Sequence, residues 1–369
     1  MRVLMISKAC VVGTYQRKLE VLACMPGVDL HVVVPPFWRD GRHVTALERA
    51  HTAGYELHVQ PMALNGNFHL HFYPGLGMVF QHLRPDILHM DEEPYNLATF
   101  QALRLARRHG ARALFFTWQN LLRRYPPPFS SFERYSFRHA SLALAGNQEA
   151  AQVLRAKGYT GQVEVVPQFG VDPDLYHKDR HAPRAETDFV IGYAGRMVEE
   201  KGVQVLLRAV AELRGAWSLR LLGRGPYQRE LEALGARLGL GGRVAYCTGL
   251  SYGDMPRELN GLDVLVLPSL TRRNWKEQFG RVLIEAMACE VPVVGSSSGE
   301  IPHLIGDAGL IVPEADARAL RDALSKLMQS RELCAELGRR GRERVLGRYT
   351  QGHIAAATQA IYRRMVGEH

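Results

Sequence analysis

Short apolar runs alternate with longer amphipathic segments along most of the chain. The runs are rich in valine, leucine and isoleucine, as in the segment 263–268, which is typical of strands buried on both faces of a parallel sheet. The segments between them carry apolar residues at helical spacing, as in 97–109. Strands that alternate with helices predict an α/β fold with doubly wound parallel sheets covered by helices on both faces.

The pattern assigns most of the chain to strands or helices. The predicted strands are 3–6, 29–35, 55–59, 86–90, 113–117, 141–147, 163–167, 189–195, 218–222, 243–249, 263–268, 291–295 and 308–314. The predicted helices are 17–24, a helix that ends near Leu83, 97–109, 148–157, 203–214, a crossover helix within 277–290, 315–327, 331–346 and 352–366.

The length of 369 residues fits two domains of ordinary size, each able to bury its own core. We predict a first domain over 1–170 and a second over 188–349. The segment between them, 171–187, is polar and has no periodic pattern, which is typical of an interdomain linker.

The formal net charge is +9, and the first half of the chain is the more basic. A basic surface favours anionic partners such as acidic lipids or phosphorylated substrates, although an arginine-rich soluble protein gives the same charge. We expect no nucleic-acid partner. The loop 121–129, with three prolines beside Arg123 and Arg124, is either a contact with an acidic membrane surface or an ordinary solvated loop.

The sequence predicts a soluble, cytoplasmic protein, with peripheral contact at the inner membrane face as a further option. No run approaches the roughly twenty apolar residues that cross a bilayer. Lys8 interrupts the first apolar segment, which therefore resembles a buried strand more than a signal peptide. The five cysteines are scattered and lack metal-binding spacing, which favours reduced thiols.

Two glutamates lie between the strands 263–268 and 291–295, in what reads as the loop and crossover helix of a βαβ unit. Glu277 is in the loop, and Glu285 is in the first turns of the helix. Because ligands bind at the carboxyl edge of open parallel sheets, this loop is expected to face a crevice. A carboxylate accepts two hydrogen bonds at once, which suits a vicinal diol. Taken alone, the pair is better explained as a solvated loop residue and a carboxylate on the helix surface.

Positive charge follows the strand 189–195. Arg196 and Lys201 lie in a glycine-containing turn before the helix 203–214. A strand, a glycine turn and a helix present backbone amides to a phosphate, and hydrogen bonds from charged donors are stronger than neutral ones. Gly280 likewise lets the backbone approach a ligand closely. These features indicate a site for a sugar joined to a phosphate, although a lone arginine and lysine are usually surface residues.

Two sequence motifs carry a resemblance to a known family. The segment 195–202 resembles the G-R-x4-K-G donor-phosphate motif of retaining glycosyltransferases of family four, and 277–285 resembles their E-x7-E motif. The resemblance covers most of 188–349. It implies the GT-B architecture, in which two Rossmann-like, doubly wound parallel-sheet domains face a central cleft. It also implies that a C-terminal helix within 350–369 crosses back to the first domain.

The resemblance implies that Arg196, Lys201 and Glu277 are catalytic. The two cations would neutralise the departing diphosphate, so no metal and no cofactor is expected. The donor-binding residues that it implies are Gly13 against the diphosphate, Arg196 and Lys201 at the phosphates, Leu250 at the base, Glu277 at the sugar hydroxyls, Phe279 and Gly280 through their amides, and Glu285 at the ribose.

The first domain is expected to bind the acceptor. Asp91, Glu92 and Glu93 follow the strand 86–90 and could hold a cation, orient acceptor hydroxyls or remain solvated. A cation ranks last because no partner ligands have a recognisable spacing. We take Glu92 as the acceptor-side candidate of the three.

Trp118, Gln119 and Asn120 follow the strand 113–117 and are further acceptor-side candidates. Members of the family often have a histidine at this point, and this chain departs from that pattern. Glutamine and asparagine can orient a hydroxyl, but neither accepts its proton at neutral pH.

The sequence thus predicts a metal-independent, retaining transferase that moves a sugar from a nucleoside diphosphate to an acceptor hydroxyl. The basic first half favours an anionic or lipid-linked glycan as acceptor. Two alternatives stay open. One keeps the fold but makes the protein a phosphorylase or an epimerase, and the other is a non-catalytic protein that binds a nucleotide sugar or a membrane.

Overall fold

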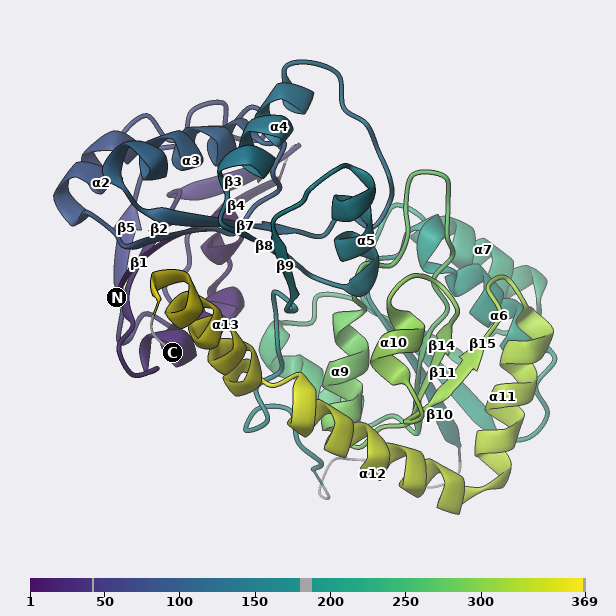
Figure 1. Ribbon diagram of the computed structural model, residues 1–369. Coiled ribbons are helices and arrows are strands. Elements are labelled where there is room, and N and C mark those ends of the chain that lie inside the picture. Colours follow the sequence, from purple (N-terminus) through teal and green to yellow (C-terminus); the bar gives the residue numbers. More distant parts are fainter. Residues whose placement is uncertain (42, 180–187, 368–369) are drawn as a thin grey trace. The chain divides into compact units, whose positions relative to one another are not determined.

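The computed structural model describes residues 1–41, 43–179 and 188–367, and it divides into two compact α/β units (Figure 1). Unit 1 consists of Met1–Gly170 and the C-terminal segment that begins at Gln351, and unit 2 is Val171–Thr350. Of the expected linker, 180–187 lies outside the described residues, whereas 171–179 belongs to unit 2. In the described part of the chain, no helix combines the length and the apolar character needed to cross a membrane.

Unit 1 is built on a seven-stranded sheet in the order β5-β2-β1-β6-β7-β8-β9, in which all neighbours are parallel. Its strands are β1 (Arg2–Ile6), β2 (Asp29–Val34), β5 (Glu56–Val59), β6 (Ile87–Met90), β7 (Arg112–Thr117), β8 (Leu142–Ala145) and β9 (Gln162–Val165). Its helices are α1 (Arg17–Ala23), α2 (Leu76–Leu83), α3 (Leu97–His109), α4 (Phe129–His139), α5 (Gln148–Ala156) and α13 (Gln351–Val366).

The sheet of unit 1 buries a separate core on each face. Successive side chains of a strand point to opposite faces, so Leu4 of β1 joins the core under α2 and α3, whereas Met5 joins the core under α1. The helix α13 completes the second core, where Tyr362 is fully buried and its hydroxyl lies 2.6 Å from Nδ1 of His89. The last helix of the chain therefore covers the sheet of the first domain (Figure 1).

A two-stranded antiparallel ribbon, β3 (Phe37–Asp40) and β4 (His43–Ala46), follows β2 and was not predicted. It is short and largely exposed, so it lacks the apolar run on which the strand predictions rested. Its sequence signal is the Asp40-Gly41 pair, since such a pair favours a tight hairpin turn. The ribbon matters for function because it carries Trp38.

Unit 2 has a six-stranded parallel sheet in the order β12-β11-β10-β13-β14-β15. Its strands are β10 (Phe189–Ala194), β11 (Trp217–Leu222), β12 (Val244–Cys247), β13 (Val264–Leu267), β14 (Val293–Ser296) and β15 (Leu310–Val312). Its helices are α6 (Val203–Ala211), α7 (Gln228–Arg237), α8 (Met255–Asn260), α9 (Arg281–Ala288), α10 (Ile301–Ile305), α11 (Ala317–Gln329) and α12 (Arg331–Arg348).

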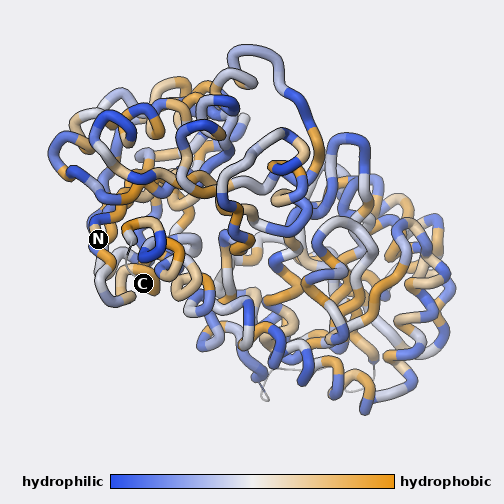
Figure 2. The backbone as a smooth tube through the Cα atoms, viewed as in Figure 1, coloured by the Kyte–Doolittle hydropathy of each residue, from blue (hydrophilic) through white to orange (hydrophobic). Residues whose placement is uncertain are grey.

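In each sheet, the first strands are added toward one edge and the later strands toward the other edge. We call the place between the two groups the reversal point. In unit 1 this point lies between β1 and β6, and in unit 2 between β10 and β13. The strands beside it are buried throughout except at the start of β1 and β10, and apolar stretches of the tube in Figure 2 follow them. In open parallel sheets, ligands bind outside the carboxyl ends of the strands at such points. Each unit therefore offers one expected site.

Candidate functional site

The loops after β10 and β13 meet at the reversal point of unit 2. The first loop contains a short 3-10 turn, Glu199–Lys201, and ends at Gly202, which begins α6 with φ of 71°. A Cβ atom on Gly202 would lie 1.8 Å from the carbonyl oxygen of Pro268, at the end of β13. Only glycine therefore allows this close approach, and the approach brings Lys201 beside the loop that carries Glu277.

Lys201 and Glu277 form an ion pair in which Nζ lies 2.6 Å from Oε2. Glu277 is buried, and the same oxygen accepts a hydrogen bond of 2.8 Å from Ser269. The Lys201 ammonium also lies 5.1 Å from the centre of the Trp275 ring. Two of the three predicted catalytic residues, which are 76 positions apart in sequence, are thus in direct contact.

Arg196 differs from Lys201 because its side chain is exposed and, among the described residues, has no ion-pair partner. Its backbone is fixed, since its carbonyl oxygen accepts a 2.8 Å hydrogen bond from the Tyr193 hydroxyl. A fixed backbone and an uncommitted guanidinium leave Arg196 able to bind an anion with two hydrogen bonds.

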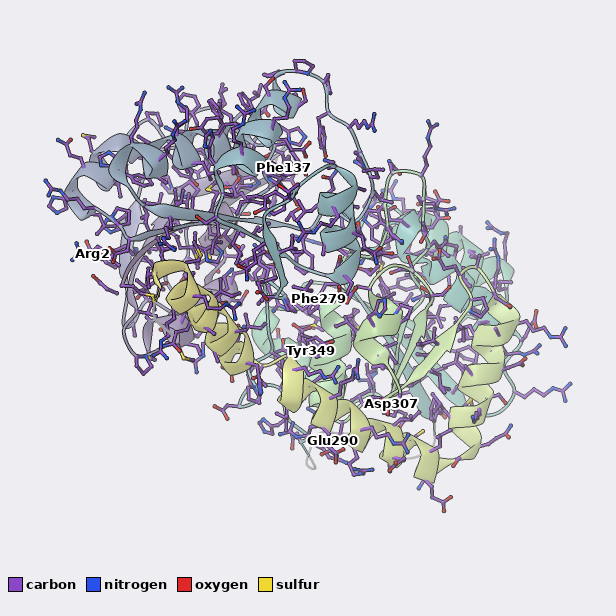
Figure 3. All side chains as sticks on the ribbon, viewed as in Figure 1. Arg2, Phe137, Phe279, Glu290, Asp307 and Tyr349 are labelled. Carbon is purple, nitrogen blue, oxygen red and sulfur yellow. The ribbon has the colours of Figure 1, made fainter. Side chains whose placement is uncertain are left out.

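Gly280 and Phe279 lie where α9 begins. Gly280 precedes the helix with φ of 85°, a conformation that favours glycine. The first amides of a helix lack intrahelical partners and point outward with positive character. The Phe279 ring, by contrast, is buried, and its centre lies 6.2 Å from that of the Tyr349 ring. Both residues are labelled in Figure 3. Phe279 therefore packs through its side chain, and only its backbone remains to contact a ligand.

Glu285 and Leu250 line one pocket of about 460 Å³ at the carboxyl ends of β10 and β11. Burial raises the pKa of Glu285, although Arg281, whose Nε lies 2.7 Å from Oε1, opposes the shift. The other lining residues are Ala194, Gly195, Leu222, Gly223, Arg224, Gly249, Met255 and Val282. This wall is glycine-rich, and Arg224 adds a cation that the sequence analysis did not select.

The reversal point of unit 1 carries the three acidic residues after β6. Asp91 accepts hydrogen bonds from Lys18 at 2.9 Å and Ser7 at 2.7 Å. Burial raises the pKa of Asp91, but the charges of Lys18 and His89 and the hydrogen bonds from Ser7 and Lys18 together outweigh this effect, so the net pKa lies below its ordinary value. Asp91 is therefore a structural ion-pair partner rather than a free ligand for a cation.

Glu92 is buried and is bound on one oxygen only. Its Oε2 contacts Lys8 at 2.6 Å and His71 at 2.8 Å, and Asn96 donates to the same atom. Burial raises the pKa of Glu92, but the positive charges and hydrogen bonds of His71 and Lys8 together lower it by more than burial raises it. The group therefore stays ionised. Its Oε1 is buried and has no hydrogen-bond partner among the described residues. Glu92 thus retains one acceptor position for a ligand hydroxyl.

Glu93 was not selected from the sequence, yet it is the one of the three whose pKa lies above its ordinary value. Burial raises its pKa to about 7, although hydrogen bonds from Thr117 at 2.5 Å and from the Trp118 amide at 2.8 Å oppose the shift. A carboxyl group with a pKa near 7 can exchange a proton at neutral pH. No local pattern distinguishes Glu93 from Glu92, so only the surroundings in the fold reveal this property.

The predicted residues after β7 have different environments. Trp118 lies against Gly146, where an added Cβ would be 2.2 Å from its ring, and its Nε1 donates to Gln168. Gln119 is buried and accepts a 2.7 Å hydrogen bond from Lys157. Asn120 is also buried and donates weakly to Glu149 at 3.4 Å. Of these three residues, only Trp118 lines the pocket beside the acidic residues.

That pocket, which we call the unit 1 pocket, has a volume of about 340 Å³. It combines the three acidic residues with several aromatic rings. Its lining residues are Lys8, Ala9, Val11, Val12, Tyr15, Trp38, Thr45, Phe68, Asp91, Glu92, Glu93, Phe116, Trp118 and Gln168. Rings and carboxylates together suit a ligand with apolar faces and many hydroxyl groups.

Gly13 begins a 3-10 turn in unit 1, and its amide donates a 2.6 Å hydrogen bond to Glu48. A Cβ atom here would lie 2.7 Å from that of Ala50, so the position has no room for a side chain. A carboxylate therefore holds the amide that was expected to face a diphosphate. Glu48 would have to release it before an anionic ligand could bind there.

Comparisons with known proteins match both halves of the chain. Residues 24–175 match a family described as Glycosyltransferase Family 4, and residues 177–344 match one described as Glycosyl transferases group 1. A 2-deoxystreptamine glucosyltransferase of Streptomyces kanamyceticus is 30% identical over a region that covers 66% of this chain and 65% of that protein. The chain therefore spans slightly less than two thirds of this relative.

Solved structures show the same fold over the whole chain. A sucrose-phosphate synthase from Thermosynechococcus elongatus has a TM-score of 0.77 and 19% identity, with 99% of both chains covered. The Anabaena protein HepE, in complex with UDP and glucose, has a TM-score of 0.74 and 19% identity, with 99% of this chain and 100% of that one covered. The predicted pair of Rossmann-like, parallel-sheet domains is confirmed.

Proposed function

Because the chain belongs to family four of the glycosyltransferases, we propose that it is a retaining glycosyltransferase that transfers a sugar from a nucleoside diphosphate to an acceptor hydroxyl. The observation that carries this proposal is the 2.6 Å contact between Lys201 and Glu277 at the reversal point of unit 2. It unites two motifs that are distant in sequence, one suited to phosphate and one suited to sugar hydroxyls.

In the proposed reaction, unit 2 holds the donor. Breaking the bond to the anomeric carbon leaves negative charge on the diphosphate, and cations directed at that charge stabilise the transition state more than the bound substrate. Arg196, which is exposed, and Lys201 supply these cations. Glu277 accepts hydrogen bonds from sugar hydroxyls, and the amides at Phe279 and Gly280 support the sugar and phosphate.

The nucleoside is proposed to occupy the pocket lined by Leu250 and Glu285. The carboxylate of Glu285 would accept hydrogen bonds from the ribose hydroxyls, and Leu250 would pack against the base. The structurally similar HepE was solved with UDP and glucose. A UDP-sugar is accordingly the first donor to test, and GDP-sugars are the second.

The acceptor is proposed to bind in the unit 1 pocket. Its rings can stack on the apolar face of a sugar or cyclitol, and Glu92 leaves Oε1 for a hydroxyl. The sequence-based expectation of an anionic or lipid-linked acceptor rests on overall charge. The pocket itself holds three carboxylates and one lysine, which favours a neutral or amino-bearing polyol. The name of the Streptomyces relative, a 2-deoxystreptamine glucosyltransferase, fits this class.

Glu93 is the group in this pocket that we propose to accept the proton of the acceptor hydroxyl. Its pKa of about 7 lets it be deprotonated at neutral pH and still basic enough to take a proton. Glu93 would thereby act as the base in place of the histidine that members of the family often have and that this chain lacks. No metal is required, because Arg196 and Lys201 supply positive charge at the leaving group.

The test is transfer from UDP-glucose to a panel of polyols and aminocyclitols, with product configuration read by NMR and with EDTA in a parallel reaction. We expect a product that keeps the donor's anomeric configuration and a rate unaffected by EDTA. An inverted product contradicts the retaining mechanism, and loss of activity in EDTA contradicts metal independence.

The alternative activities give different results in the same assay. A phosphorylase requires inorganic phosphate and releases a sugar phosphate. An epimerase changes the donor without an acceptor, and a non-catalytic protein shows a nucleotide-dependent thermal shift without turnover. A ligand at a hundred times its Kd stabilises the fold by about 2.7 kcal/mol, which such a shift readily detects.

A further inference from the structure

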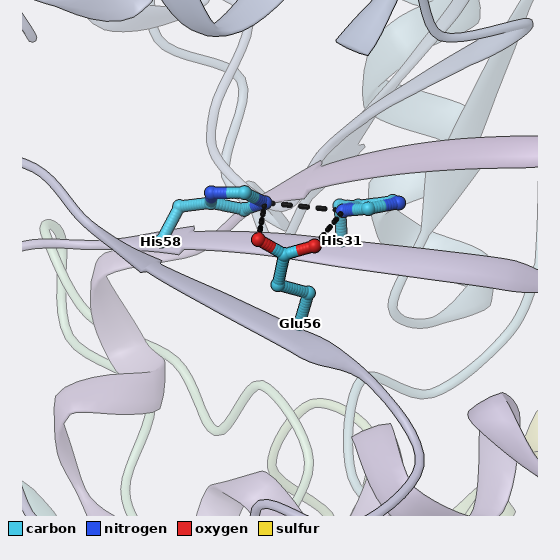
Figure 4. A group of neighbouring side chains, drawn as sticks. All are labelled: His31, Glu56 and His58. Atoms are coloured by element: carbon cyan, nitrogen blue, oxygen red, sulfur yellow. Dashed lines mark hydrogen bonds and ion pairs between the residues drawn. The ribbon is translucent and has the colours of Figure 1, made fainter.

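Three side chains of the neighbouring strands β2 and β5 converge in unit 1. His31 and Glu56 are directly paired in the parallel register of the two strands. His58 lies two residues beyond Glu56 and therefore on the same face of β5. Figure 4 shows the two imidazole rings and the carboxylate pointing toward a common centre.

The distances between the converging atoms are those of ligands around one ion. Nδ1 of His31 lies 3.1 Å from Nε2 of His58 and 3.3 Å from Oε2 of Glu56, and Nε2 of His58 lies 3.7 Å from Oε1 of Glu56. A tetrahedral zinc ion with bonds of about 2.0–2.1 Å holds its ligand atoms roughly 3.3–3.5 Å apart. One ligand atom from each of the three residues lies within 4.8 Å of the others, so small movements of the side chains would place all three around a single ion.

A further carboxylate supports the orientation of His31. Its other ring nitrogen, Nε2, lies 3.2 Å from Oδ1 of Asp29. Histidine ligands of metals usually donate this second N–H to a carboxylate or a carbonyl, which leaves the first nitrogen with its lone pair facing the ion. When Nε2 of His31 donates to Asp29, its Nδ1 lone pair faces the Glu56 carboxylate, so a positive centre between them is favourable.

We propose that His31, Glu56 and His58 form a binding site for a divalent transition-metal ion of the zinc class. Two imidazoles and one carboxylate are ligands that zinc accepts, and a fourth position remains for water. The three ligands lie on the edge strand β5 and its neighbour β2, and none of them lines the unit 1 pocket. The role of the site is therefore structural: the ion ties the edge strand β5 to β2.

The experiment uses the full chain without an affinity tag, stripped of metal with a chelator and then titrated with ZnCl₂ in a calorimeter. We expect one saturable zinc site per chain in the wild type, and its loss in His58→Ala and Glu56→Gln. Asp29→Asn should retain the site with affinity reduced by about 10–100-fold, the usual effect of losing a carboxylate that orients a ligand. His43→Ala, which changes an exposed histidine outside the cluster, is the matched control and should bind as the wild type does.

A second measurement uses only the wild type, so its result stands even if the variants fold poorly. Wild type loaded with CoCl₂ should show the visible absorption bands of a tetrahedral site, and added ZnCl₂ should remove them. The absence of saturable zinc binding by the wild type overturns the proposal, as does unchanged binding by His58→Ala. In that case the hydrogen bond between the two imidazoles and the contacts of His31 with Asp29 and Glu56 account for the cluster.

Discussion

The two units have the same kind of sheet, yet the sites at their reversal points differ in how their charges are satisfied. In unit 2, one cation is paired with a glutamate and another, Arg196, is exposed. In unit 1, Asp91 and Glu92 each contact a lysine, and the pocket around them is lined by rings. Unit 2 is thus suited to an anion common to many donors, and unit 1 to the shape and hydroxyl pattern of a particular acceptor.

The difference also shows how each site is specified. The unit 2 site depends on glycines whose replacement would cause a backbone clash, such as Gly202 and Gly223. The unit 1 pocket depends on side chains from several separate segments, including Lys8, Trp38 and Trp118. A site formed by close backbone contacts tolerates few substitutions. A site formed by side chains can acquire a different ligand when one of those side chains is replaced.

The strongest test of the anion site is Lys201→Met or Glu277→Gln. Each should reduce kcat by about 10²–10³-fold, the usual effect of removing one group that stabilises transition-state charge. Lys326→Met, which changes an exposed lysine of unit 2, is the control. Initial-rate kinetics and circular dichroism check the outcome, and near-normal rates in both site variants would reject the assignment.

The acceptor site is tested by pH. Wild-type kcat/KM should rise as the pH increases through about 7, because Glu93 is deprotonated only above its raised pKa. Glu93→Gln should remove this dependence and lower kcat by at least about 10²-fold. A Gln variant that keeps the wild-type pH profile excludes Glu93 as the base. Glu164→Gln is a control, since it changes a glutamate that contacts Arg364 and does not line the pocket.

Gly202→Ala tests the dependence of unit 2 on its backbone. The added Cβ meets the Pro268 carbonyl, so we expect a loss of roughly 3 kcal/mol or more in the free energy of unfolding, together with loss of nucleotide binding. Gly239→Ala is a matched control, because Gly239 has φ of 70° but no atom within 4 Å of the added Cβ. It should lose only about 1–2 kcal/mol. Equal losses in urea titrations would show that backbone conformation, not the contact, matters.

The smallest expected effect concerns the rings of the unit 1 pocket. Trp38→Ala should raise the KM for the acceptor about fivefold and leave the KM for the donor unchanged, since stacking on an aromatic ring is worth about 1 kcal/mol. A parallel rise in both KM values would show that Trp38 supports the fold rather than the acceptor. Phe68→Ala, which removes the ring 5.2 Å from Trp38, should have a similar but weaker effect.

The sequence by itself determined most of the elements and their order, although the helices α4, α7 and α8 were not predicted, and it indicated a candidate anion site. Apolar runs and helical spacing are local properties, so the strands of both sheets and helices such as α3 were predicted within a few residues. Each of the segments 195–202 and 277–285 is an unbroken stretch of sequence, so a ligand class could be predicted for it without a structure. The ribbon of β3 and β4 was missed because short, exposed strands have no apolar run.

Only the tertiary structure decided which residues meet and how they titrate. The Lys201–Glu277 contact, the unit 1 pocket and the convergence of His31, Glu56 and His58 depend on strand order and register, which the periodicity of a single strand does not encode. The distinction between Glu92 and Glu93 is of the same kind. Adjacent glutamates look identical in sequence, and their pKa values differ because folding places Lys8 and His71 against the buried Glu92, whereas the neutral donors Thr117 and Trp118 bind Glu93.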